Sequence, residues 1–352
     1  MNQRLIAAVA AVPLVLGLIL AAALMPLPFV VYAPGSTFDV LAKGENEAEI
    51  IQVLGHKTYR TGGELRMTTV LVTAPETKKT LFELMGAWLD PDDAVYPYEA
   101  VHGKDKTDQQ NQIEGEVQMV TSQDAAIAVA QTELGLKVTP LPGVAHVNSD
   151  GPADGKLMVR DLFLEIGDRP VKTPEDVVEA VRDGTPGKPL EFVVLRDHER
   201  TEVTVTPEQG EDGAQVGIVL GTGFRFPFDV QVNIDPVIGG PSAGLMFSLA
   251  IYDTLTPGSL TDDQTVAGTG EITPDGRVGP IGGIQQKIVA ARDADAQLFM
   301  VPPANCEEAL NSDNGEMQLV RAETMHTARV AIEAWAADRD AELPSCEDVE
   351  AS

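Results

Sequence analysis

Basic residues are scarce in this sequence of 352 residues, which has 25 Lys and Arg against 54 Asp and Glu and a formal net charge of −29. A nucleic acid would have to give up its counterions to a surface that offers mainly carboxylates, so the composition excludes a nucleic-acid binder. Cysteine is also scarce, because Cys306 and Cys346 are too few for a disulfide framework or a four-thiolate zinc site. The length fits roughly two domains, and 43% hydrophobic residues exclude an intrinsically disordered acidic chain.

A phosphate-binding loop of the form G-x-x-x-x-G-K-[ST] is missing as well. The nearest stretch, residues 184–189 (GTPGKP), has the wrong spacing and ends in a proline that breaks a helix. The sequence therefore predicts a protein that works without its own ATPase. We expect no cofactor and no metal.

Charged residues are absent between Arg4 and Asp39, and Leu5–Met25 is an almost unbroken apolar run. A helix rises 1.5 Å per residue, so this run is long enough to cross a hydrocarbon core of about 30 Å. Since Arg4 precedes the run and acidic residues follow it, the positive-inside rule predicts a transmembrane anchor over residues 1–33 with a short cytoplasmic N-terminus. We expect a single-pass cell-membrane protein whose bulk is extracytoplasmic.

A cleaved signal peptide is the alternative, because Ala21 and Ala23 offer an A-x-A-like cleavage site. The run of 21 residues is longer than the usual apolar region of about 7–15 residues, which favours the uncleaved anchor. In an oxidising compartment Cys306 and Cys346 either form a bridge that closes a loop of about 40 residues or stay as free thiols. The residues leave that choice open.

Beyond the anchor the chain predicts a mixed α and β fold with a differently patterned block in its middle. We divide it into 34–139, 140–208, 209–340 and an acidic, mobile tail at 341–352. The segment 91–107 is expected to be an exposed loop. Expected strands cover 65–73, 144–147, 162–166, 190–195, 201–206, 229–234, 265–272 and 297–301, and expected helices cover 122–135 (with Ser122 as N-cap), 173–181, 241–255, 284–294 and 327–337.

Residues 239–244 (GGPSAG) are the segment most informative about chemistry. Glycines around Ser242 at a strand-to-helix junction allow a tight turn that exposes the hydroxyl, and free amides near Gly240 and Ser242 can stabilise an oxyanion. Because a serine hydroxyl is a weak nucleophile, the site needs a base. Two candidates for that base compete.

The first candidate treats Gly240-x-Ser242-x-Gly244 as the nucleophile elbow of a Ser-His-Asp α/β-hydrolase. That fold needs a His downstream of the nucleophile, and His326 is the one His after Ser242. The second candidate is Lys287, which follows the glycine-rich segment 279–283 and is flanked by apolar residues. A lysine can act as base when burial lowers its pKa toward about 7–8.

The chain resembles the proteolytic domain of Lon proteases through two long segments, GGPSAGLMFSLAIYDTLT and VAGTGEITPDGRVGPIGGIQQKIVAARDA. It also resembles the family more weakly upstream, in GELRMTTV and EGEVQMVTSQDAAIAVA. The resemblance implies that Ser242 is the nucleophile and Lys287 the general base, supported by Thr269, Gly240 and Pro241. Two features depart from the family. Gly239 stands where many members have an acid, and residues 230–233 replace a strand that commonly carries His.

The block 140–208 resembles a bacterial PDZ domain in SDGPADGKL, LEIGDRPV and LEFVVLRDHERTEVTVT. This similarity implies that it binds extended polypeptides and is inserted within the protease domain. The whole is similar to bacterial membrane-anchored PDZ-containing Lon-like peptidases. The resemblance implies an α+β fold, an ATP-independent serine endopeptidase with a Ser–Lys dyad, unfolded or flexible polypeptide substrates and a homo-oligomer such as a hexameric ring. A catalytically inactive adaptor that keeps the same fold is the remaining alternative.

Overall fold

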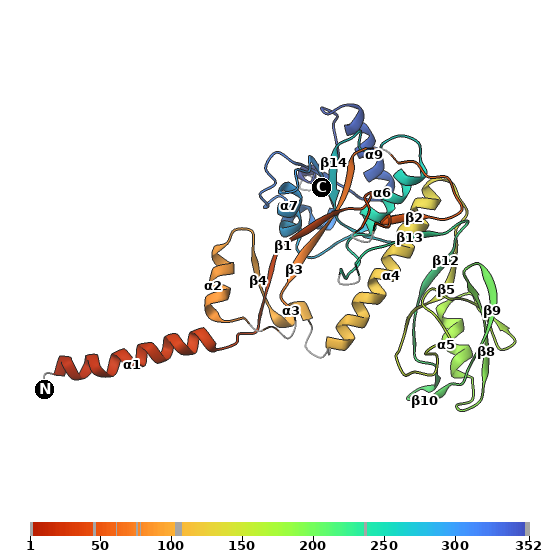
Figure 1. The fold of residues 1–352 in the computed structure, drawn as a ribbon, viewed down its shortest axis with the longest axis horizontal. Coiled ribbons are helices and arrows are strands. Elements are labelled where there is room, and N and C mark those ends of the chain that lie inside the picture. The colour runs from red at the N-terminus through yellow and green to blue at the C-terminus, as the bar shows by residue number, and fades with distance from the viewer. Residues whose placement is uncertain are drawn as a thin grey trace.

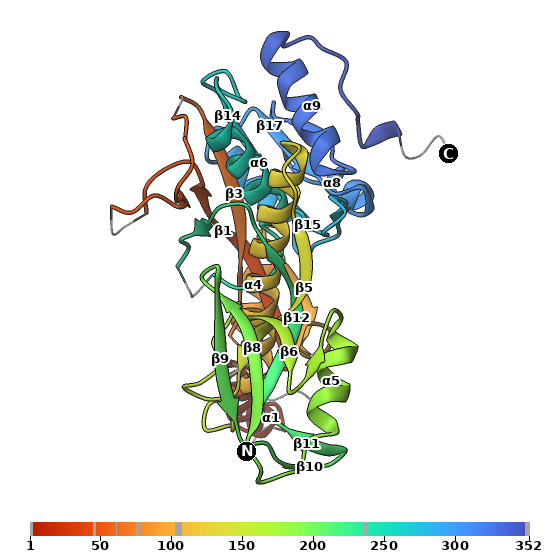
Figure 2. The same cartoon turned by 90° about the vertical axis from the view of Figure 1, so that its right-hand side faces the viewer.

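The computed structural model describes residues 3–44, 47–60, 62–74, 77, 79–102, 108–235 and 238–348. The side chains of residues 3–10 and 108 also lie outside the description. The chain forms a larger unit around a six-stranded sheet and a smaller unit around a second sheet, and the two meet along a long helix, α4 (Asp108–Glu133) (Figures 1 and 2).

The sheet of the larger unit has the strand order β18–β17–β14–β3–β1–β4. Strands β3, β14, β17 and β18 run parallel, whereas β1 pairs antiparallel with β3 and β4. Parallel neighbours need crossover connections, which helices supply here. The strand bounds are β1 (Phe29–Asp39), β3 (Glu64–Val72), β4 (Ala94–Pro97), β14 (Thr265–Gly268), β17 (Leu298–Val301) and β18 (Gln318–Arg321).

Helices pack on both faces of this sheet, because successive strand residues point to opposite sides. Val266 belongs to the core that includes α4, α6 (Gly244–Leu255) and α9 (Met325–Ala337). The adjacent Ala267 packs instead with α7 (Ile284–Arg292) and α8 (Cys306–Ala309). The core that contains Val266 is built from residues that precede the smaller unit in sequence and from residues that follow it. The smaller unit is therefore an insertion within the larger one.

The remaining elements of the larger unit are short. A two-stranded pair joins β2 to β13, and another joins β15 to β16. Helices α2 and α3 lie beside the edge strand β4, close to the N-terminal helix α1 (Figure 1). Their bounds are α1 (Gln3–Leu24), β2 (Ile51–Val53), α2 (Leu81–Leu89), α3 (Tyr98–His102), β13 (Val230–Val232), β15 (Glu271–Ile272), β16 (Val278–Gly279) and the 3-10 turn Pro303–Asn305.

The smaller unit has the strand order β12–β5–β6–β8–β9, with β7 paired to β6, and a core of its own around Phe163 and Phe192. Its helix α5 starts as expected, since Thr173 and Asp176 form a capping box. The sheet includes β12, so this unit extends to Arg225 rather than to residue 208. Its elements are β5 (Thr139–Val147), β6 (Leu162–Ile166), β7 (Arg169–Pro170), α5 (Pro174–Arg182), β8 (Leu190–Arg196), β9 (Glu199–Val205), β10 (Glu208–Gly210), β11 (Gly213–Gln215) and β12 (Ile218–Arg225).

Two expectations about 91–135 are wrong. The expected loop contains β4 and α3, because β4 pairs with β1 at the sheet edge, while residues 103–107 lie outside the described residues. Ser122 is not an N-cap, because α4 starts fourteen residues earlier at Asp108. The expected stop at Gly135 holds, since Gly135 has a φ of 76° just after the helix ends.

The apolar N-terminal run forms α1, but no helix within the described residues is both long and apolar enough to cross a membrane. The side chains of residues 3–10, which belong to the expected anchor, lie outside the description.

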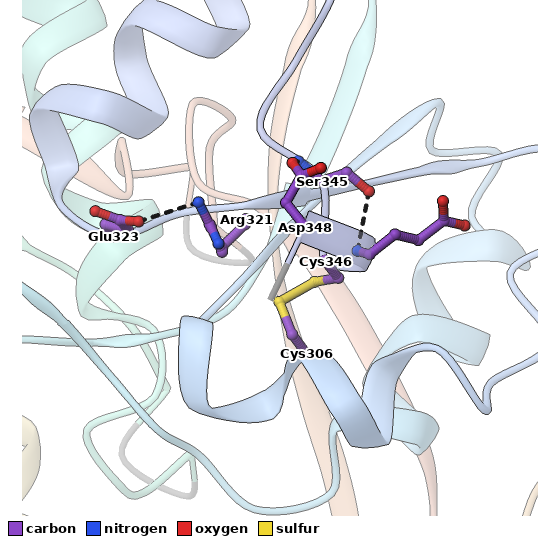
Figure 3. Close-up of a disulfide and its surroundings, with 7 residues drawn as sticks. Cys306, Arg321, Glu323, Ser345, Cys346 and Asp348 are labelled. Atoms are coloured by element: carbon purple, nitrogen blue, oxygen red, sulfur yellow. Dashed lines mark hydrogen bonds and ion pairs between the residues drawn. A yellow bond between two sulfur atoms is a disulfide. The ribbon is translucent and has the colours of Figure 1, made fainter. Parts of the chain in front are cut away.

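The acidic tail differs from the mobile segment expected. Cys346 forms a disulfide with Cys306 of α8 (Figure 3). The Arg321 amide of β18 donates to the carbonyl of Pro344 at 2.9 Å. Ser345 also forms an isolated antiparallel β-bridge with Val320 of β18. The described part of the tail is therefore fastened to the sheet, while residues 349–352 lie outside the described part.

Candidate functional site

Ser242 lies in the turn immediately before α6. The turn follows Gly240, whose φ of 89° is a left-handed conformation that only glycine adopts without strain. Gly244 allows the helix to approach closely, because a Cβ there would lie 2.7 Å from Ile272 Cγ2. The two glycines of the motif thus fix the path of the chain on either side of the serine.

Lys287 reaches Ser242 from α7, on the opposite side of the sheet from α6. Its Nζ lies 2.7 Å from Ser242 Oγ, and its residue is only 3% exposed. Burial among apolar residues of α7, including Ile284 and Ile288, lowers the pKa of Lys287 from 10.5 to about 7. A neutral amine has a free lone pair, so it can accept the proton of the Ser242 hydroxyl.

Thr269 completes the cluster at the carboxyl end of β14. Its fully buried hydroxyl donates to the carbonyl of Ser242 at 3.0 Å and accepts from Lys287 Nζ at 2.8 Å. The Gly270 amide donates to the same carbonyl at 2.8 Å. These bonds fix the backbone of the serine and the amine of the lysine with respect to each other, which is what a nucleophile–base pair requires.

The start of α6 offers donors for a developing negative charge. The amides of Ser242 and Ala243 donate to no group in the described part of the chain, and Ala243, the N-cap, has no side-chain hydrogen bond. Amides at a helix start carry partial positive charge. They can therefore bind an oxyanion beside the Ser242 hydroxyl.

Pro241 and Ser122 form a contact that the sequence did not reveal. The buried hydroxyl of Ser122, in the middle of α4, donates to the carbonyl of Pro241 at 2.9 Å. This bond holds the residue just before Ser242. Ser122 and Pro241 lie 119 positions apart, so local sequence patterns carried no signal for it.

His326 is placed away from this cluster. Its Nδ1 lies 2.7 Å from Glu133 Oε1, on the side of α9 that faces α4, whereas Ser242 pairs with Lys287. The α/β-hydrolase alternative requires contact between Ser242 and His326, and the structure does not show it. Among the described residues, no three His, Cys, Asp or Glu side chains gather into a set that could hold a metal ion.

The smaller unit contains a groove of about 1020 Å³ between α5 and β12. Val177 and Val181 of α5 line one side, and Ile218 and Leu220 of β12 line the other. Strand β12 is the edge of its sheet, so one row of its backbone groups is not paired with a neighbouring strand. The groove lies apart from Ser242 and Lys287, neither of which lines it.

Two family models match this chain. Residues 236–328 match the Lon protease (S16) C-terminal proteolytic domain, the region that contains Ser242, Thr269 and Lys287. Residues 117–206 match the PDZ domain, which covers most of the smaller unit and the second half of α4.

Curated relatives give the same result. The chain is 46% identical over 115 residues to Lon protease 1 of Herpetosiphon aurantiacus, a match that covers 32% of this chain and 13% of that protein. It is 39% identical over 112 residues to a peroxisomal Lon protease homolog 2 of Caenorhabditis elegans, covering 30% and 14%. The chain thus spans less than a fifth of these relatives' length.

Solved structures match the smaller unit. The PDZ domain of an SdrC-like protein from Listeria monocytogenes is 18% identical with a TM-score of 0.22, and the match covers 23% of this chain and 86% of that one.

Proposed function

Since this chain carries a Lon-type proteolytic domain and a PDZ domain, we propose that it is a serine endopeptidase in which Ser242 is the nucleophile and Lys287 the general base. The observation that carries the proposal is the 2.7 Å contact between the serine hydroxyl and a buried lysine amine whose pKa is lowered to about 7. Lys287 takes the proton of Ser242 as the hydroxyl attacks a peptide carbonyl, and it returns a proton to the leaving amine. The amides of Ser242 and Ala243 bind the oxyanion.

A fluorophosphonate probe tests this mechanism directly, because it reacts with activated serines. We expect labelling of the unchanged protein, and no labelling of Ser242→Ala or Lys287→Ala. Peptide cleavage by either variant should fall by roughly 10³-fold or more. The matched variant His326→Ala should keep both labelling and cleavage. An unlabelled wild-type protein would instead identify a catalytically inactive adaptor.

The groove between α5 and β12 gives the proposed enzyme a means of recruiting substrates. An extended polypeptide can add to the free edge of β12 as a further strand, with side chains resting on Val177 and Val181. No phosphate-binding loop is present to drive unfolding. The substrates are therefore flexible tails or unfolded polypeptides.

Val178 of α5 lines the groove and is partly open to solvent, so it offers a test of recruitment. Val178→Lys should raise KM for a long unfolded protein and leave the cleavage of a short peptide unchanged. Val330→Lys, on exposed α9 surface outside the groove, is the matched control. Equal effects of the two variants on KM would contradict a recruiting role for the groove.

The location proposed is the cell membrane, with α1 as anchor and both units on the extracytoplasmic side. Support comes from the uncharged stretch between Arg4 and Asp39 and from the disulfide, which is stable in oxidising compartments. Assembly into a homo-oligomeric ring belongs to the same proposal and rests on the resemblance to Lon alone. Sedimentation of the detergent-solubilised chain measures it.

A further inference from the structure

Helix α2 exposes an unusual number of large apolar side chains. Trp88 is 78% exposed and Leu89 is 71% exposed, and only Leu84 and Ala87 of the helix are buried. Such a concentration is typical of surfaces that meet a partner or a membrane. The exposed apolar residues of this nine-residue helix are Leu81, Phe82, Met85, Trp88 and Leu89.

The helix also presents no free charge along its length. Its single ionisable side chain, Glu83, accepts from the amide and the hydroxyl of Thr80 at 2.8 Å in a capping box. The same carboxylate lies 3.6 Å from Lys79. Since the one negative charge is already engaged, α2 can contact an apolar phase without bringing an unpaired charge into it.

The position of α2 identifies what it contacts. Helix α2 packs against α1, and the Leu27 amide after α1 donates to the Lys79 carbonyl before α2 at 2.9 Å (Figure 1). The residues of α1 from Val12 onward expose apolar side chains as well. Further exposed apolar residues lie on the two strands that leave this end of the molecule, namely Phe29, Leu71 and Val72.

We propose that α2 rests on the surface of a phospholipid bilayer, with Trp88 and Leu89 inserted at the boundary between headgroups and acyl chains. The apolar surface of α2 continues from α1, which is why a bilayer rather than a second copy is the occupant. Tryptophan is the residue enriched at that depth, because its ring is apolar and its N–H polar. The proposal rests on the membrane location proposed for α1, and it fixes the larger unit against the lipid.

The chain contains its own reporter, because Trp335 is only 4% exposed and Trp88 is the other of its two tryptophans. The full chain is reconstituted into phosphatidylcholine vesicles, and flotation measures whether it is bound. Quenching by aqueous iodide and by brominated acyl chains then measures the depth of Trp88. We expect iodide quenching to fall about tenfold relative to free tryptophan, and bromine quenching to appear. Trp335→Phe removes the buried background.

The variant Phe82→Ser/Leu89→Ser should restore iodide quenching of Trp88, and Val330→Ser on α9 should not. A protein that floats with Trp88 still open to iodide overturns the role of α2 and leaves the anchor standing. Failure to float overturns both, while peptide cleavage reports separately on the protease. Shielding of Trp88 that depends on protein concentration without lipid identifies a second copy as occupant and also overturns the proposal.

Discussion

The burial of the Lys287 amine lowers the stability of the fold. Its pKa is about 7 in the folded chain and near 10.5 when unfolded. Between these values the unfolded chain binds a proton that the folded chain lacks, so this residue makes unfolding free energy rise with pH from about 7 to 10.5. A pKa lowered by one unit corresponds to about 1.36 kcal/mol, so burial of this amine lowers the free energy of unfolding by about 4 kcal/mol at pH 7.

Lys287→Met should therefore stabilise the protein by about 4 kcal/mol at pH 7 and by about half that at pH 9. Urea unfolding at the two pH values measures the difference. Lys188→Met, at an exposed position, should change stability by less than about 0.5 kcal/mol at either pH. A gain from Lys287→Met that did not shrink with pH would show that the folded amine is charged.

The same titration predicts that kcat/KM of the wild type rises with pH through about 7.

Ser122 positions the turn that carries Ser242, since its hydroxyl donates to the Pro241 carbonyl. Ser122→Ala should lower kcat on the order of tenfold with KM unchanged, because the turn carrying Ser242 loses a fixed point. Ser248 is a matched control, as its equally buried hydroxyl donates to the Leu245 carbonyl within its own helix. If Ser248→Ala lowers kcat as much, the effect is a general loss of packing.

Among the elements, the segment after α9 is fastened covalently by the Cys306–Cys346 bridge. The bridge closes a loop between residues 40 positions apart and ties the tail to α8 (Figure 3). Closing a loop of this length restricts the unfolded chain, which stabilises the fold by about 4 kcal/mol in the chain-entropy model.

Cys346→Ser should lower the free energy of unfolding by about 3–4 kcal/mol, measured by urea titration. Treatment of the wild type with a reducing agent should produce the same loss, and treatment of the variant should produce none. A reductant that destabilises both proteins equally would mean that the bridge is not the cause. Fluorophosphonate labelling of Ser242 should persist in the variant, since Lys287 is held by α7.

Over the whole molecule, the larger and the smaller unit have separate hydrophobic cores, which predicts two unfolding transitions. Phe192 belongs to the core of the smaller unit and Phe299 to a core of the larger unit, and both are fully buried. Phe192→Ala should lower the stability of one calorimetric transition by about 3–5 kcal/mol and leave Ser242 labelling intact. Phe299→Ala should lower the other transition and labelling together. A single transition that shifts equally in both variants would indicate one cooperative unit.

Sequence patterns predicted the middle of the chain well, because its elements are short and strongly marked. Thr173 and Pro174 mark the start of α5, and β8 and β9 alternate cleanly around a turn in which Asp197 and His198 take positive φ. Ser242 and Lys287 were named from two motifs, and the structure brings their side chains together. Their catalytic roles stay predictions until the variants are measured.

The segment 91–135 was predicted poorly, for physical reasons. The first half of α4 is mostly polar and contains Gly115, and its few apolar residues, such as Ile113 and Val117, are too sparse to mark a helix. Strand β4 has four residues and is defined by its pairing with β1, a partner more than sixty positions away. Ser122 was predicted as an N-cap because the acceptor that its hydroxyl contacts, the carbonyl of Pro241, is distant in sequence and leaves no local signal.

The turn of α4 around Ser122 has a mechanical consequence. Asp124 accepts a hydrogen bond from Arg160 of the smaller unit at 2.9 Å. Two residues earlier, the Ser122 hydroxyl donates to the carbonyl of Pro241. One helical turn of α4 therefore contacts both the smaller unit and the turn that carries Ser242. A displacement of Arg160 would therefore reach the backbone of Ser242 through a single turn of α4, over two side-chain hydrogen bonds.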